Sequence, residues 1–149
     1  MPFTKTHFYK ACLVLIATAI VFSHGQTVMA GDRALRKFKK CNFHQSACTM
    51  SLPNTTVTLD IRPKPIKAMR TLTFDLEVSG TVLTRQPHID LDMPGMVMGP
   101  NRVLMKPIKE GRYEGEGFIV KCPTGKKTWR AKVTLPGVGI VDFVFDVLH

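Results

Sequence analysis

The sequence lacks the residue patterns on which most enzymes depend. Its 149 residues include five histidines, and it contains no nucleophile elbow, no phosphate-binding glycine loop and no zinc-binding His-Glu helix. Asp90 and Asp92 could act as paired carboxylates, but alternating acids just before a turn are more simply solvated side chains. Because the requirements for an active site are almost entirely unmet, we expect a protein that is not an enzyme.

A long apolar segment is also absent. The strongly apolar run at residues 11–22 is shorter than the about 20 residues needed to span a bilayer. It follows a short segment with lysines and no acid, and it precedes a more polar stretch that ends at Ala30. This three-part pattern is typical of a secretory signal peptide, so we expect cleavage after Ala30 and a periplasmic or secreted mature chain. The alternative is an uncleaved N-terminal membrane anchor.

Acidic residues are scarce relative to basic ones. The chain has 11 Asp and Glu against 21 Lys and Arg, for a net charge of +10. A basic chain can bind nucleic acid or an anionic membrane, but export argues against nucleic acid, and we expect no nucleic-acid partner. The basic residues are scattered except in an arm from Arg33 to Lys40. We expect this arm to be solvated and mobile, or alternatively to contact a membrane surface.

The chain has only four cysteines. Cys12 lies inside the apolar run, so three remain after cleavage, and an odd number in an exported chain predicts one disulfide and one free thiol. Cys41 and Cys48 are close in sequence, with turn-forming residues between them, and we expect them to pair. Cys122 is then free, either as an inert buried thiol or as a thiolate ligand for copper.

A helical period is missing as well, whereas the alternation typical of β-strands is widespread. Turn-forming residues separate the alternating segments at intervals that suit short strands. The pattern predicts an all-β fold, an immunoglobulin-like antiparallel β-sandwich of about seven strands, with Trp129 in its core. The clearest alternating segments are residues 55–61, 72–78, 128–135 and 140–148.

The expected organisation has three parts. Residues 1–30 form the signal peptide, residues 31–54 the basic arm and the disulfide loop, and residues 55–149 the sandwich domain. We find no internal repeat and no low-complexity segment.

Methionines gather in the segment that follows the acids. Met93, Met96 and Met98 lie within six residues of one another. Between the first two, Pro94-Gly95 predicts a type II turn, which would bring the Cα atoms of Met93 and Met96 within about 7 Å. If the chain is extended after the turn, Met98 shares a face with Met96.

This cluster suits a soft metal ion. Thioethers select Cu(I), so we expect Met96 and Met98 as core ligands of a copper site. Met93, His88 and Cys122 are further candidate ligands. The alternative is that the methionines fill gaps in the core or form an adaptable contact surface, because the segment contains no strict metal-binding motif.

Three stretches of the sequence and a last Phe-rich strand carry a family resemblance. They resemble the small exported bacterial domains of the YtkA-like and FixH-like kind, and the stretches are TVTLDIRPKPIKAMRTLTFDLEV, DMPGMVMGPNRVLMKPIKEGRYEGEGFIVKC and GKKTWRAKVTLPG. The most specific parts are M-x-M-G-x-N-R, which begins at Met96, and the spacing of Cys122, Gly125 and Trp129. The resemblance covers the chain from about Thr55 to Val147.

The resemblance implies an immunoglobulin-like fold outside the cytoplasmic membrane and an association with copper handling or respiratory-oxidase assembly. The chain lacks a second His-x-Met element found in better-defined periplasmic copper chaperones, which leaves the ligand set open. We therefore expect an exported protein that binds or delivers Cu(I), with a copper-transport or oxidase-assembly protein as partner. The alternative is a periplasmic protein-interaction module, or an envelope-assembly or oxidase-assembly domain, without a metal.

Overall fold

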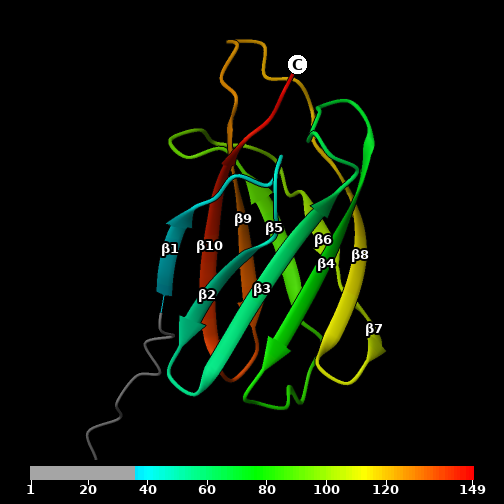
Figure 1. The fold of residues 1–149 in the computed structure, drawn as a ribbon. Coiled ribbons are helices and arrows are strands. Elements are labelled where there is room, and N and C mark those ends of the chain that lie inside the picture. The colour runs from blue at the N-terminus through cyan, green and yellow to red at the C-terminus, as the bar shows by residue number, and fades with distance from the viewer. Residues whose placement is uncertain (1–35) are drawn as a thin grey trace, which may run out of the picture. The chain divides into compact units, whose positions relative to one another are not determined.

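The computed structural model describes residues 36–149 as an all-β protein in which two five-stranded sheets form a sandwich (Figure 1). The first sheet has the order β1-β10-β9-β5-β6 and the second has the order β2-β3-β4-β8-β7. The expected signal peptide lies outside the described residues. Within residues 36–149, no helix is long and apolar enough to cross a bilayer.

The strands are short, and turns or short loops connect most of them. In chain order they are β1 (Arg36–Lys40), β2 (Cys48–Leu52), β3 (Thr55–Arg62), β4 (Thr71–Ser79), β5 (His88–Asp92), β6 (Arg102–Leu104), β7 (Lys106–Lys109), β8 (Arg112–Phe118), β9 (Thr128–Leu135) and β10 (Gly139–Asp146).

The core lies between the sheets and consists of the inward-facing residues of the alternating strands. In β9, for example, buried residues alternate with half-buried ones, and Trp129 is fully buried at the start of the alternation. β3, β4 and β5 show the same alternation. The expected core position of Trp129 is therefore confirmed, and burial of these side chains is the main source of stability in such a fold.

The segment from Arg102 to Ile108, with Val103 and Met105 as its alternating apolar residues, is divided between two strands, one in each sheet. β6 pairs with β5, and β7 pairs with β8 after the chain has crossed between the sheets at Met105. The crossing segment lies close to β8, because a Cβ atom on Gly115 would be only 2.7 Å from the carbonyl oxygen of Leu104. Glycine in the middle of β8 is what allows this approach.

The basic arm differs most from expectation. Arg36–Lys40 forms β1, which pairs in parallel with β10, and Arg36 bonds the buried carboxylate of Asp142 at 2.6 Å. All five side chains of β1 are exposed, so the strand shows no apolar alternation. Its pairing depends on the backbone of the β10 edge, and a hydropathy pattern cannot reveal that. The boundary expected at residues 54–55 falls inside the β2–β3 hairpin.

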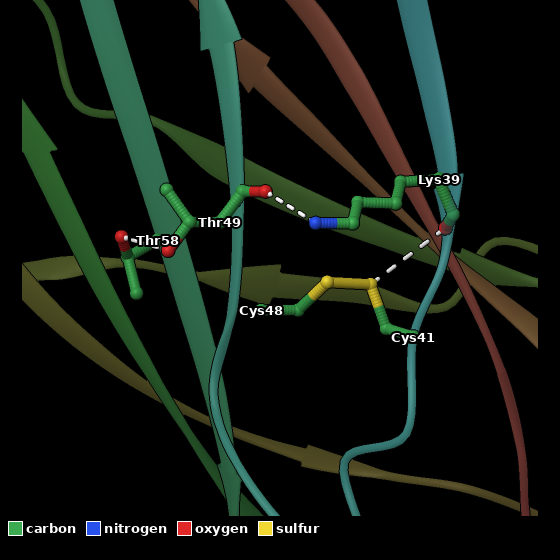
Figure 2. The surroundings of a disulfide bond; sticks show 5 residues. All are labelled: Lys39, Cys41, Cys48, Thr49 and Thr58. Carbon is green, nitrogen blue, oxygen red and sulfur yellow. Dashed lines mark hydrogen bonds between the residues drawn. A yellow bond between two sulfur atoms is a disulfide. The ribbon is translucent and has the colours of Figure 1, made fainter.

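The expected disulfide is confirmed. Cys41 and Cys48 are bonded, and they connect the end of β1 in one sheet to the start of β2 in the other. Beside this bond, the ammonium of Lys39 donates to the carbonyl oxygen of Thr49 at 3.1 Å (Figure 2). Lys37 makes the same kind of contact with Ser51 at 2.8 Å. The disulfide and the two lysines thus tie together the neighbouring edges of the two sheets.

Candidate metal centre

The turn between β5 and β6 has the geometry that its sequence predicts. The N–H of Met96 donates to the carbonyl oxygen of Met93 at 3.1 Å, and Gly95 has a φ of 77°. Both features define a type II turn, in which glycine accepts the left-handed backbone conformation. We call residues 93–101 the Met loop.

The three methionines of the Met loop all face the protein. Met93 is buried, and it continues the inward face of β5 two residues beyond Leu91. Met96 and Met98 are half-buried against the core, whereas Val97 between them is fully exposed. The burial pattern therefore agrees with the prediction that Met96 and Met98 share a face.

A distant part of the chain brings the fourth sulfur. Cys122 lies in the loop at residues 119–127, between β8 and β9, and it is a buried free thiol. Its Sγ lies 3.9 Å from the Sδ of Met96, although 26 positions separate the two residues. The Oγ1 of Thr124 lies 3.1 Å from the same Sγ. The structure therefore joins two residues that the sequence offered only as separate candidates.

The surroundings of Cys122 favour its thiolate. The hydrogen bond with the Thr124 hydroxyl is the largest cause of a pKa below that of an ordinary cysteine. Burial acts in the opposite direction, but the backbone N–H groups of Thr124 and Lys126, and the charge of Lys126, also lower the pKa. A thiolate is the form of cysteine that binds metals and reacts as a nucleophile.

His88 is not part of this cluster. It lies at the opposite end of β5, and a strand rises about 3.3 Å per residue, so His88 is about 13 Å from the residue before the Met loop. Its ring is near Asp90, 3.7 Å away. Burial and the charges of Arg102 and Lys132 lower the pKa of His88, against the opposing effect of Asp90. Proximity in sequence suggested His88 as a ligand, but the length of β5 separates it from the Met loop.

Hard donor groups do not form a competing site. Among residues 36–149, no three His, Cys, Asp or Glu side chains are grouped so that they could hold a metal ion. The donors that the structure places at the Met loop are the thioether sulfurs and the thiol of Cys122. That set of donors fits Cu(I) and fits Zn(II) or Mg(II) poorly.

Ion pairs that the sequence did not reveal hold the base of the Met loop. Asp92, the last residue of β5, accepts two hydrogen bonds from Arg130 at 2.7 and 2.6 Å. Asp90 accepts two from Arg102 at 2.7 and 3.2 Å. Burial raises the pKa of Asp90, but the hydrogen bond and charge of Arg102, with Lys132 and His88, outweigh it, so the pKa is below its usual range.

Two hydrogen bonds hold the end of the loop at Asn101. The N–H of Leu91 donates to the carbonyl oxygen of Asn101 at 2.8 Å, and the side chain of Asn101 donates to the carbonyl oxygen of Phe118 at 2.9 Å. Outward acids on β5 and outward cations on β9 were visible in the sequence. The strand register that pairs these acids with these cations was not visible in the sequence, because 38 positions separate Asp92 from Arg130.

The chain matches no protein-family model, no curated protein and no solved structure. The resemblance to YtkA-like and FixH-like domains therefore stays a prediction from its motifs.

Proposed function

We propose that this protein is an exported Cu(I)-binding protein whose metal site lies between the Met loop and Cys122. The observation that supports this most strongly is the 3.9 Å contact between the sulfur atoms of Cys122 and Met96. Two soft donors from distant parts of the chain meet there, and residues 36–149 contain no group of three His, Cys, Asp or Glu side chains that could hold the ion instead. Soft sulfur donors are the ligands that select Cu(I).

The spacing of the two sulfurs suits a shared metal ion. Metal–sulfur bonds of about 2.3 Å that meet at a trigonal angle hold their sulfur atoms about 4.0 Å apart. The observed distance of 3.9 Å is close to that value. Little movement of the backbone is therefore needed for Cys122 and Met96 to become ligands of one ion.

The other sulfurs complete the proposed site. Met98 shares the face of Met96 and is half-buried, which makes it our choice for the third ligand. Met93 is buried beneath the turn and could bind only if the turn shifts, so we assign it a packing role in the metal-free protein. The thiolate of Cys122 would supply the negative charge that balances Cu(I), and Thr124 and Lys126 favour that thiolate.

The position of the site suits delivery of the metal. The Met loop and residues 119–127 are both surface loops, and Met96 and Met98 remain partly exposed. A partner could therefore exchange ligands with the bound ion without unfolding the sandwich. We propose that this partner is a copper-transport or oxidase-assembly protein, as the motif resemblance implies.

Paired substitutions in the Met loop test the proposal. We expect the parent protein, loaded without oxygen, to bind one Cu(I) per chain, and Met96→Leu combined with Met98→Leu to abolish this binding. Leucine retains the volume and apolarity of methionine, so the fold should persist. Met105→Leu is the matched control, because Met105 is buried in the core away from the Met loop. If the double variant holds Cu(I) as tightly as the parent, the proposed site is wrong.

A further inference from the structure

The loops around the sulfur cluster are joined into one surface. The N–H of Met69 donates to the carbonyl oxygen of Ile119 at 2.8 Å. The N–H of Leu148 donates to the carbonyl oxygen of Ile66 at 2.9 Å. Together with the Cys122–Met96 contact, these bonds connect residues 63–70, 93–101, 119–127 and 147–149. These segments lie at the end of the sandwich where Figure 1 marks the C-terminus. We call this surface the loop end.

Exposed apolar side chains lie on each of its segments. Val97 at the tip of the Met loop is completely exposed, and Met69 is 63% exposed. Val120 and Leu148 are 43% and 41% exposed. Single exposed apolar residues are ordinary, but four on adjoining loops form an apolar surface that favours contact with another apolar phase.

Two of these segments, residues 63–70 and 119–127, contain cations, and none of the four segments contains Asp or Glu. Lys64 forms a salt bridge with Asp60. The other cations are exposed and form no salt bridge with a described residue; they are Lys67, Arg70, Lys121, Lys126 and Lys127. The acids at or near the ends of the neighbouring strands are already paired. Asp60 pairs with Lys64, Asp92 with Arg130 and Asp146 with Lys40. The loop end therefore has a positive charge that the protein itself does not neutralise.

We propose that the loop end docks on an anionic lipid surface. Apolar tips would enter the boundary between headgroups and acyl chains, while the surrounding lysines and arginine contact lipid phosphates. This combination of apolar and basic residues is the one that membrane-surface segments use. The docking does not depend on copper, because every group that it uses is part of the metal-free fold.

Two features favour lipid over another macromolecule. The loop end has no exposed Trp or Tyr, the residues that usually anchor protein interfaces and stack on bases. Its apolar residues instead lie on separate loops, and two of these loops, residues 63–70 and 119–127, also contain cations. The basic arm is a weaker candidate for this contact, because Arg36 is bound to Asp142 and Lys39 to the backbone of β2.

Vesicle binding tests the proposal directly. The exported chain, isolated from cells and free of copper, is mixed with phosphatidylcholine vesicles that contain or lack about 30% phosphatidylglycerol, and bound protein is measured by co-sedimentation. We expect binding to the anionic vesicles only, and we expect it to be lost as salt rises from about 0.1 to 1 M. Absence of binding to the anionic vesicles, or equal binding to both kinds, would overturn the proposal.

Paired variants locate the contact. Lys126→Gln with Lys127→Gln should lower the partition coefficient about thirtyfold, since each cation near an anionic surface contributes about 1 kcal/mol. Lys106→Gln with Lys109→Gln removes the same charge from exposed positions on β7 and should change the partition coefficient little. If both pairs weaken binding equally, net charge rather than the loop end is responsible, and the proposal is wrong.

A second pair tests the apolar part of the contact. Val97→Ser should weaken binding several-fold because it removes the most exposed apolar side chain of the loop end. Val82→Ser is the control, because Val82 is 79% exposed in the loop between β4 and β5, at the other end of the sandwich. Equal effects of the two changes would contradict the proposed orientation. Copper loading is measured separately, so a failure of membrane docking would not count against the proposed metal site.

Discussion

At the scale of single residues, Cys122 decides how the proposed site responds to pH. A metal-binding thiol must lose its proton, whereas a thioether has none to lose. Cu(I) affinity should therefore fall as pH falls through the titration range of Cys122. Because the Thr124 hydrogen bond and neighbouring groups lower the pKa of Cys122, this fall should begin at a lower pH than for an ordinary cysteine.

Competition titrations with a Cu(I) chelator across a pH series check this expectation. Cys122→Ser should bind Cu(I) more weakly at neutral pH and show little dependence on pH, since only thioethers remain. Thr124→Val, which keeps the thiol but removes its hydroxyl partner, should move the decline to higher pH. A parent affinity that does not change with pH would show that Cys122 is not a ligand.

His88 supplies a pH effect on stability rather than on binding. Burial is the main cause of its lowered pKa, so the fold favours the neutral ring, and the unfolded chain takes up the proton at higher pH. The free energy of unfolding should therefore decrease as pH falls below about 6.5, the range in which the unfolded histidine becomes protonated.

The measurement is urea unfolding at pH values on both sides of that range. His88→Gln should lose less stability on acidification than the parent, because it has no ring to protonate. Identical pH dependence in the two proteins would mean that His88 does not favour its neutral form in the folded state.

At the scale of secondary structure, the sequence was most informative where burial and period agree. β4 and β9 were predicted from alternation, and the predicted inward residues are the buried ones. β1 was missed because its side chains are all exposed, and the split between β6 and β7 was missed because Met105 continues an apolar pattern while the backbone changes sheets. Alternation reports which face of a strand is buried, but it does not report pairing partners.

Trp129 tests the assigned face of β9. The indole is fully buried between the sheets, and no described residue bonds its Nε1 atom. Trp129→Ala should lower the free energy of unfolding by about 3–5 kcal/mol, enough to unfold most of a domain of this size. Lys106→Ala on exposed β7 should cost less than about 0.5 kcal/mol. Denaturant unfolding compares them, and similar small losses would contradict the packing of β9.

At the scale of the whole molecule, the site depends on long-range assembly that local patterns cannot show. The turn between Met93 and Met96 was predictable, because Pro94-Gly95 determines it locally. The meeting of Cys122 with Met96 was not, because it requires that β8 and β5 deliver their loops to the same end of the sandwich. For the same reason, His88 was close in sequence but is distant in space.

The charge distribution is also a property of the assembled fold. Acids of the described chain lie mostly within strands, where outward carboxylates pair with arginines and lysines of neighbouring strands. The loops at the sulfur-containing end keep unpaired cations instead. Exposed cations without a partner among the described residues therefore lie beside the proposed metal site, although others, such as Lys106 and Lys109, lie on β7.

X-ray absorption at the copper edge of the Cu(I)-loaded protein is the most direct test of the proposed metal site. We predict a first coordination shell of sulfur alone, with three sulfur atoms at about 2.3 Å, and loss of one of them in Cys122→Ser. A shell that contains nitrogen or oxygen, or one that Cys122→Ser leaves unchanged, would contradict a site formed by the Met loop and Cys122.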